Sequence, residues 1–183
     1  MKNHVLLRIV KSGLMLSERR HGMSEENTNI PRFIGESTNS VDSKGRIFVP
    51  TKWRSQLNGT MILHAGFGRS ASGRYLELTT VDNFNRLISM INALPPSEKR
   101  FESLKRVIFR NSEEVSADKQ GRILIPKRLI EHACLKSEII MTGAGDHIEI
   151  WDPDMLDTAD ASYSHDSLMN DFELLNAMLT ERS

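Results

Sequence analysis

Short apolar runs recur along the chain between polar turns, and this pattern predicts a β-rich protein. Two runs, 61–66 and 139–145, are predominantly apolar, which is typical of buried strands. Two segments alternate apolar with polar residues, which is typical of strands with one buried face. The runs IFV and ILI are apolar at every position, so we expect their strands to be buried on both faces. The expected strands are 46–49, 61–66, 74–78, 122–125, 139–145 and 147–151.

Other segments place apolar residues at every third or fourth position, which predicts amphipathic helices. Two short helices are expected after Pro50 and Pro126, because proline suits the first position of a helix. The tail after Asp166 has helical spacing too, and we expect it to end the chain as a docked helix. The expected helices are 51–57, 80–94, 97–110, 127–135, 152–160 and 166–183.

One phrase of the sequence occurs twice. The stretch DSKGRIFVP at 42–50 returns as DKQGRILIP at 118–126, 76 residues later. Each copy is followed by a short helix, two strands and a helix, which indicates a duplicated unit of roughly 70–75 residues. About five extra residues in the first copy fall within 66–74. The expected organisation is a leader at 1–30, a first repeat with its helix at 31–94, a connecting helix at 95–110, a second repeat at 111–165 and a C-terminal helix at 166–183.

The leader at 1–30 is polar and aperiodic, which predicts disorder. Met23, followed by Ser-Glu-Glu, offers an alternative start for the natural protein. The apolar run Val5–Val10 is too short to span a bilayer and lacks a signal-peptide cleavage site, so no membrane partner is expected. The single Cys134 excludes an intramolecular disulfide and fits a reducing cytoplasm.

Equal totals of 24 basic and 24 acidic side chains conceal a strong asymmetry. Residues 146–183 hold ten acidic side chains and one basic, so residues 1–145 hold 14 acidic and 23 basic. A basic body carrying both copies of the repeated phrase favours a polyanionic partner, although a solvated surface with an acidic tail is the plainer alternative. The acidic final helix could pack on the basic 97–110 helix of a neighbouring copy.

The repeated phrase reads as a tight turn that leads into a strand. Asp42 and Gly45 occupy the first and fourth positions of a type I turn, in which the carboxylate accepts backbone N–H groups and the glycine adopts positive φ. Arg46 then begins the strand, and we expect Asp42 to pair with its guanidinium and to aim it. Asp118, Gly121 and Arg122 repeat the arrangement.

Turn geometry explains the aspartate and the glycine but does not require the arginine. A surface Arg–Asp pair contributes only about 0–1 kcal/mol to stability. Arginine is, however, well suited to bidentate contacts with phosphate or with the O6 and N7 atoms of guanine. Two such arginines in a basic body favour nucleic acid as the partner.

Several motifs together resemble the MraZ family of bacterial transcriptional regulators: the two Asp-x-x-x-Arg phrases, F-x-G-E from Phe33, the Val-Pro and Ile-Pro endings and the late E-I-W-D. The resemblance covers about residues 31–165. It implies an α+β, β-rich fold of tandem SpoVT/AbrB-like swapped-hairpin repeats that form a pseudo-dimeric β-barrel with flanking helices. It also implies a cytoplasmic, nucleoid-associated homo-oligomeric ring. This ring would bind double-stranded promoter DNA at G-rich direct repeats and repress its own division and cell-wall operon.

Carried onto this chain, the resemblance assigns DNA binding to both turns. The implied DNA-binding residues are Asp42, Lys44, Arg46, Asp118, Lys119 and Arg122, with Lys52 and Arg54 as weaker candidates for phosphate contacts. The second turn has Gln120 where the first has Lys44, so the two turns need not contact DNA equally. Lys52 and Arg54 could instead cover a subunit contact.

Other kinds of function find little support in the sequence. The loop at 68–75 has the glycine spacing of a phosphate-binding loop but carries Arg74 and Tyr75 where lysine and Ser/Thr are needed. The six histidines lack metal-ligand spacing, and we expect no enzyme activity, cofactor or small-molecule ligand. The matched Glu77 and Glu149 are expected to face solvent or a neighbouring subunit. The rival functions are an AbrB-like antitoxin and a structural ring protein without DNA readout.

Overall fold

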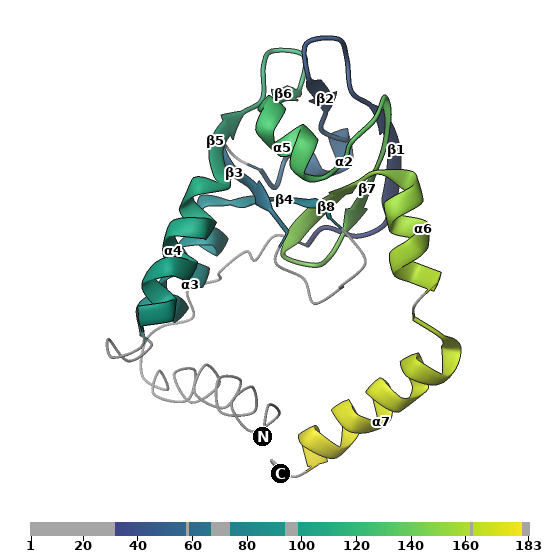
Figure 1. Ribbon diagram of the computed structural model, residues 1–183. Helices are drawn as coiled ribbons and strands as arrows, with labels where there is room; N and C mark the ends of the chain where they lie inside the picture. The colour runs from purple at the N-terminus through teal and green to yellow at the C-terminus, as the bar shows by residue number, and fades with distance from the viewer. Residues whose placement is uncertain (1–31, 58, 67–73, 94–98, 162, 181–183) are drawn as a thin grey trace.

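The computed structural model describes residues 32–57, 59–66, 74–93, 99–161 and 163–180, and the expected leader at 1–30 lies outside them. The described part is a mixed α+β fold, as expected, with one six-stranded sheet, one two-stranded sheet and six helices. Figure 1 shows the two-stranded sheet at one end of the molecule, with two short helices next to it and the longer helices on two sides of the molecule.

The six-stranded sheet is antiparallel throughout, with the order β1-β7-β8-β4-β3-β5. Its outer strands, β1 and β5, were not expected from the sequence, whereas the four inner strands lie within three residues of their expected bounds. The strands are β1 Glu36–Ser40, β3 Thr60–Ala65, β4 Leu76–Thr80, β5 Ser112–Ser116, β7 Glu138–Gly143 and β8 His147–Trp151.

Each copy of the repeat contributes its first strand to the other copy. β1 of the first copy pairs with β7 of the second, and β5 of the second pairs with β3 of the first. The hairpins β3–β4 and β7–β8 meet at the centre through β4 and β8, where Glu77 lies opposite Glu149. The two copies therefore share one sheet and cannot be separated without breaking backbone pairings.

The expected closed barrel is not formed by the strands that the structure describes. The six-stranded sheet is open, with β1 and β5 at its two edges. The remaining strands, β2 Arg46–Phe48 and β6 Arg122–Leu124, pair only with each other. Because β2 and β6 form this separate ribbon, they do not bridge the two edges of the large sheet.

The ribbon of β2 and β6 packs one face on the main core. Ile47 and Ile123 lie opposite each other in the ribbon and are fully buried, as are Val49 and Ile125 just beyond it. The core continues through the inner faces of β3, β4, β7 and β8. A smaller apolar cluster joins β3 to the helical hairpin through Ile62, Phe84, Ile91 and Ile108.

The expectation that both ribbon strands are buried on both faces is wrong. Phe48 is 48% exposed and Leu124 is 54% exposed. Successive residues of a strand point to opposite faces, so only the middle residue of each three-residue strand reaches the core. The outer face of the ribbon therefore carries large apolar side chains in the open.

All six described helices were expected from the sequence, although α2 and α5 are each three residues shorter than expected. The prolines before α2 and α5 occupy the N-cap rather than the first helical position. Thr80 caps α3, because its hydroxyl accepts a hydrogen bond from the Asn83 N–H at 3.2 Å. The helices are α2 Thr51–Arg54, α3 Val81–Asn92, α4 Lys99–Arg110, α5 Lys127–His132, α6 Pro153–Ala161 and α7 His165–Thr180.

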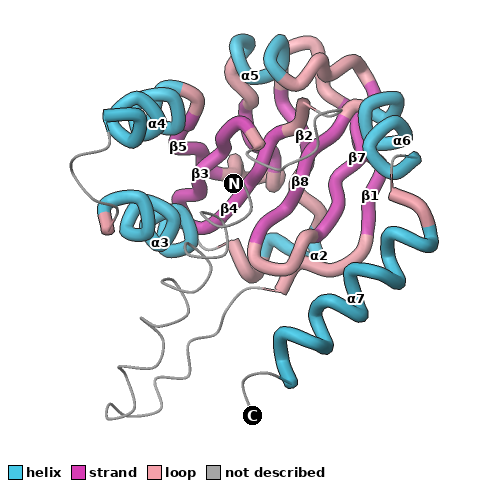
Figure 2. Tube along the Cα trace, turned by 60° about the horizontal axis from the view of Figure 1, so that its bottom comes forward, coloured by secondary structure: helices cyan, strands magenta, loops and turns pink. Residues whose placement is uncertain are grey.

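The final helix, α7, is not docked on the described part of this chain. It contains no buried residue, and Phe172 and Leu175 are about half exposed. Figures 1 and 2 show it extending away from the sheet beyond α6. Its apolar stripe is as predicted, but the surface that would cover that stripe is not supplied by the described residues.

Candidate nucleic-acid interface

The turn that precedes β2 holds Arg46 through Asp42. One carboxylate oxygen of Asp42 accepts the backbone N–H groups of Lys44 at 2.8 Å and Arg46 at 2.9 Å. The other oxygen accepts the guanidinium, with Nε at 2.8 Å and Nη2 at 2.7 Å. The Gly45 N–H closes the turn on the Asp42 carbonyl at 2.9 Å. The expected Asp–Arg pair is confirmed.

The turn that precedes β6 repeats this geometry. Asp118 accepts the N–H groups of Gln120 at 2.9 Å and Arg122 at 3.0 Å. Its second oxygen accepts the Arg122 guanidinium from Nε at 2.9 Å and Nη2 at 2.7 Å. Gly45 and Gly121 have φ of +79° and +82°, so the expected positive φ is confirmed at both turns.

Both aspartates remain ionised over a wide pH range. The hydrogen bonds from Arg46, from its side chain first and then from its backbone N–H, lower the pKa of Asp42 to about 2. Arg122 acts in the same way on Asp118 and lowers its pKa to about 2. Each guanidinium therefore has a charged partner at neutral pH, and that partner fixes the direction in which it points.

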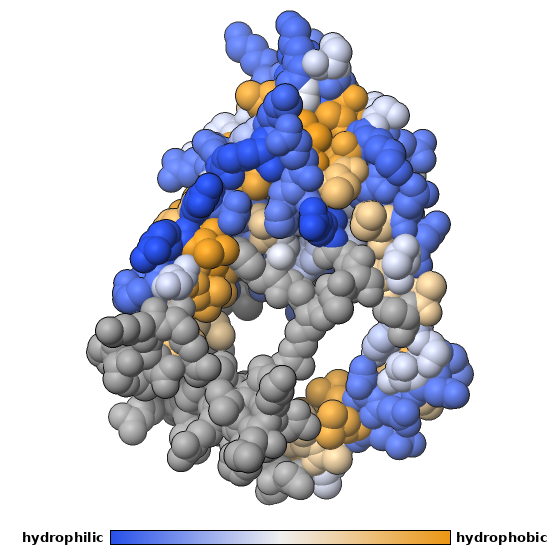
Figure 3. All heavy atoms as spheres, in the orientation of Figure 1, coloured by the Kyte–Doolittle hydropathy of each residue, from blue (hydrophilic) through white to orange (hydrophobic). Residues whose placement is uncertain are grey.

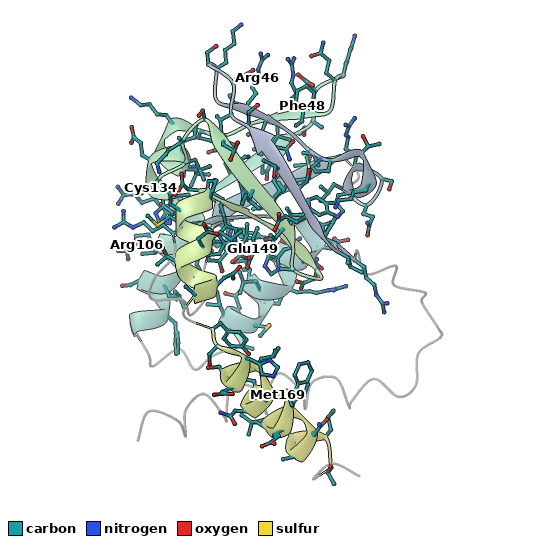
Figure 4. All side chains as sticks on the ribbon, turned by 90° about the vertical axis from the view of Figure 1, so that its right-hand side faces the viewer. Arg46, Phe48, Arg106, Cys134, Glu149 and Met169 are labelled. Atoms are coloured by element: carbon teal, nitrogen blue, oxygen red, sulfur yellow. The ribbon has the colours of Figure 1, made fainter. Side chains whose placement is uncertain are left out.

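The ribbon brings the two arginines onto one exposed face. Arg46 lies opposite Leu124, and Arg122 lies opposite Phe48, with the buried isoleucines between them. The guanidinium carbon of Arg122 lies 5.9 Å from the centre of the Phe48 ring, within the range of a cation–π contact. In Figure 4, Arg46 and Phe48 lie together at one end of the molecule, far from Met169 on α7.

Each turn rests on the helix of the other copy. The Val49 N–H donates to the Gly121 carbonyl at 3.0 Å, and the Ile125 N–H donates to the Gly45 carbonyl at 2.9 Å. Behind Gly45 stands the side chain of Ile130, whereas the guanidinium of Arg54 stands behind Gly121. The two arginine-bearing turns are therefore fixed relative to each other by the exchange between copies.

The lysines of the turns are exposed and the two later cations are engaged elsewhere. Lys44 and Lys119 are exposed at the turns. Arg54 donates through Nε to the Val49 carbonyl at 2.9 Å. Lys52 donates to the Glu36 carbonyl at 2.9 Å and lies 4.5 Å from the centre of the Trp53 ring. The structure thus groups the two turn lysines with the arginines and gives Lys52 and Arg54 contacts within the fold.

Sequence reasoning missed Phe48 and Leu124 as members of this surface. The signal was present, because a period of two places each of them on the same face as the arginine two residues earlier. In Figure 3 hydrophilic side chains cover the end that carries the turns, and hydrophobic surface lies beside them.

A second polar cluster lies on the large sheet and was not expected. Glu77 and Glu149 do not face open solvent: their side chains are 15% and 24% exposed. His64, 2% exposed, lies 3.6 Å from Glu77. Trp151 donates Nε1 to Glu149 at 2.9 Å, and neighbouring Glu149 and Asp146 raise the pKa of His147 to about 9. The fold brings these groups together, which their scattered positions in the sequence did not indicate.

In the described ranges, no group of three or more His, Cys, Asp or Glu side chains is arranged to hold a metal ion. Among the same residues, no helix has the length and apolar character needed to cross a membrane.

Comparisons with known proteins place the chain in a family. A family model described as "MraZ protein, putative antitoxin-like" matches residues 108–175. A protein of Dictyoglomus thermophilum named transcriptional regulator MraZ is 40% identical over 119 residues, which cover 65% of this chain and 78% of that protein. Proteins of the same name from Herpetosiphon aurantiacus and Alkaliphilus metalliredigens are 32% and 34% identical, covering 74% and 80% of this chain and 91% and 96% of their own lengths. Because these identities extend over most of both partners, the chain belongs to the MraZ family.

Proposed function

We propose that this protein is a sequence-specific DNA-binding transcriptional regulator. The observation that carries the proposal is the pair of aspartate-held arginines on one exposed face of a two-stranded ribbon. A ribbon of this kind fits the major groove of B-DNA, where arginine makes its commonest specific contact with guanine. The names of the similar proteins, transcriptional regulator MraZ, agree with this assignment.

The roles of individual residues follow from their surroundings. Arg46 and Arg122 would read guanine, because each has a charged aspartate that orients the guanidinium before DNA arrives. Asp42 and Asp118, which the resemblance places among the DNA-binding residues, would contribute by orienting the arginines. Lys44 and Lys119 would neutralise phosphates beside the turns. Lys52 and Arg54 remain weaker candidates, because their hydrogen bonds within the fold would have to be shared with or given up to DNA.

The finer assignments are proposed on the strength of the family. The regulator would repress its own division and cell-wall operon by binding G-rich direct repeats, and would act in the cytoplasm at the nucleoid. The exchange of β1 and β5 between copies supports tandem SpoVT/AbrB-like swapped-hairpin repeats at 31–94 and 111–165, with a connecting helix at 95–110 and a final helix at 166–183.

Assembly into a homo-oligomeric ring is proposed as part of the same mechanism. One chain offers only a few cationic contacts, and binding that depends on phosphate contacts weakens steeply with salt. Several copies meeting several short DNA repeats multiply these weak contacts through high effective concentration. The exposed apolar stripe of α7 supports a contact between copies, because the described residues of its own chain do not cover it.

Binding to the DNA upstream of the protein's own gene tests the proposal. Arg46→Ala and Arg122→Ala should each weaken binding by about 5- to 150-fold, the range that follows from losing a bidentate guanine contact of about 1–3 kcal/mol. Arg86→Ala is the matched control, because Arg86 is exposed on α3 and bonds only to Asn83 among the described residues. If both turn variants bind this DNA as tightly as the parent does, the proposal fails.

A rival assignment is an antitoxin, which the family description names. An antitoxin would also bind DNA through these turns, so the two functions separate at the partner. Purification of the natural complex would distinguish them: a co-purifying toxin at equal stoichiometry supports the rival, whereas homo-oligomers alone support the regulator.

A further inference from the structure

The apolar side chains between the two arginines are exposed in an unusual place. Phe48 is 48% exposed and Leu124 is 54% exposed, although Ile47 and Ile123 beside them are fully buried. Each lies directly across the ribbon from an arginine: Leu124 from Arg46, and Phe48 from Arg122. The surface is therefore two cation–apolar pairs placed at opposite ends of one short antiparallel ribbon.

Phosphates offer nothing to these apolar side chains. Phosphate contacts explain exposed cations, but a phenylalanine or leucine gains nothing from a charged backbone. A partner for this face must present an apolar group next to a hydrogen-bond acceptor, so that the apolar side chain and the arginine can contact them together. The floor of the major groove does so wherever the C5 methyl group of thymine adjoins the O6 and N7 acceptors of guanine.

We propose that Phe48 and Leu124 read the methyl groups of thymines that adjoin the guanines read by Arg122 and Arg46. This inference rests on the proposed DNA-binding function and names the second element of its specificity. Each arginine and its cross-strand apolar partner form one reading unit, so a unit recognises a guanine next to a thymine. The ribbon contains two such units, so it would read two guanine–thymine steps.

The two units are not equivalent. Phe48 presents a flat ring that also lies beneath the Arg122 guanidinium, 5.9 Å away, whereas Leu124 offers a smaller branched side chain to the Arg46 unit. The larger ring contacts more of a methyl group and limits the positions that Arg122 can take. The Phe48–Arg122 unit should therefore discriminate between thymine and its unmethylated analogue more strongly than the Leu124–Arg46 unit.

Replacing thymine by uracil in the DNA tests the inference directly, because it removes only the C5 methyl group. The probe is the fragment protected by the parent protein upstream of its own gene, made once with thymidine and once with deoxyuridine. The parent should bind the thymidine DNA more tightly, by about fourfold for each methyl group contacted, the value expected for one buried methylene-sized group. Single replacements should locate the two most sensitive thymines next to guanines.

The side-chain variants assign the effect to residues. Phe48→Ala and Leu124→Ala should each move the ratio of the two affinities towards one, and the double variant should abolish it. A melting temperature of each variant equal to that of the parent would show that the ribbon is intact. Met90→Ala is the matched control, since Met90 is a similarly exposed apolar residue on α3, and it should leave the ratio unchanged.

Each other outcome has a definite meaning. If the protein binds DNA through its arginines but the parent shows no difference between thymidine and deoxyuridine, the inference is wrong and the proposed function stands. The inference also fails if Phe48→Ala and Leu124→Ala keep the full ratio, or if they change the oligomeric state instead, which would make this face a contact between copies. If no DNA is bound at all, both proposals fall together.

Discussion

The turns at 42–46 and 118–122 hold their arginines with the same set of hydrogen bonds. The bond from the third residue of the turn to the aspartate is 2.8 Å in the first and 2.9 Å in the second, and both guanidinium Nη2 atoms lie 2.7 Å from their carboxylate. What differs is the surroundings. Lys44 is replaced by Gln120, and the arginines face Leu124 and Phe48 respectively.

This difference separates two kinds of constraint on a duplicated segment. Aspartate, glycine and arginine recur because the turn geometry and the aimed guanidinium need them at these positions. The residues that vary lie where an outside molecule would be met, or where one copy packs on the other. Two turns with the same geometry and different neighbouring residues can recognise two different base-pair steps of DNA.

The largest expected effect is on the helices that support the turns. Trp53 in α2 and Leu129 in α5 are equivalent buried residues, 1% and 0% exposed. Trp53→Ala should lower the free energy of unfolding by about 3–5 kcal/mol and Leu129→Ala by about 2–5 kcal/mol, because each leaves a cavity. Trp53→Ala also removes the donor to the Ile34 carbonyl at 3.3 Å. Denaturant titration measures both, and losses below about 1 kcal/mol would show that the helices do not support the ribbon.

Replacing each arginine by lysine compares what the two turns contribute to DNA affinity. Arg46→Lys and Arg122→Lys should each weaken binding about tenfold, because lysine keeps the charge but loses the planar fork. Arg122→Lys should cost more, since the Arg122 guanidinium also lies 5.9 Å from the centre of the Phe48 ring, and lysine lacks the planar group that suits such a contact. Affinities measured at one salt concentration decide this, and equal affinities for both variants and the parent would show that only charge matters.

Adding a side chain at the turn glycines tests what stands behind each turn. Gly45→Ala and Gly121→Ala should each cost about 1–2 kcal/mol of stability, because alanine disfavours positive φ. A Cβ at Gly121 would collide with the Arg54 guanidinium, whereas a Cβ at Gly45 would lie 3.1 Å from the Ile125 carbonyl oxygen. Arg54→Ala should therefore relieve part of the cost of Gly121→Ala and none of the cost of Gly45→Ala. Thermal unfolding of the two double variants checks this difference, and equal relief in both would contradict it.

The smallest expected effects are on pH dependence. Both turn aspartates have a pKa of about 2 in the folded protein, below the ordinary value of 3.8. Their contribution to stability is complete above pH 3.8 and is lost as the pH falls through about 2. Between pH 2 and pH 5, the free energy of unfolding of Asp42→Asn and of Asp118→Asn should depend on pH in the same way. A difference between them would mean that Lys44 or Gln120 tunes its turn.

His147 gives the opposite sign at alkaline pH. Its pKa of about 9 lies above the ordinary 6.5, so its contribution is complete below pH 6.5 and is lost as the pH rises through about 9. The equivalent residue of the first copy is Tyr75, which instead stacks on Trp151 at 4.3 Å. His147→Gln should flatten the decline in melting temperature between pH 7 and pH 9.5. A decline equal to that of the parent would show that deprotonation of His147 does not contribute to it.

Local patterns in the sequence predicted the four inner strands, the helices and the two turns, because each is determined by residues close together in the chain. The pattern in ESTNS and SEEVS did not predict β1 and β5, because their exposed edge positions are polar. Polar edges discourage pairing with other molecules, and the same property removes the apolar signal of a strand. Nor did it predict that the copies exchange these strands, since pairing between distant segments has no local signature.

The candidate site was predicted in its polar part and misjudged in its apolar part. The pairing of Asp42 with Arg46 follows from turn chemistry within five residues. The exposure of Phe48 and Leu124 depends on whether other parts of the protein cover the outer face of the ribbon. The apolar composition of the two strands suggested that both faces of the ribbon would be buried. The period of two places both residues on the arginine face, and the tertiary arrangement shows that this face is uncovered in the described part of the chain.

The exchange of strands also sets an order of events during synthesis. Glu36 in β1 pairs with Thr142 in β7, so the first strand must wait for more than a hundred further residues before it has a partner. At about 5–20 residues per second on the ribosome, this delay is roughly 5–20 s. The fold is therefore completed late, and a nascent chain stalled before residue 138 would hold an incomplete sheet for a chaperone to protect.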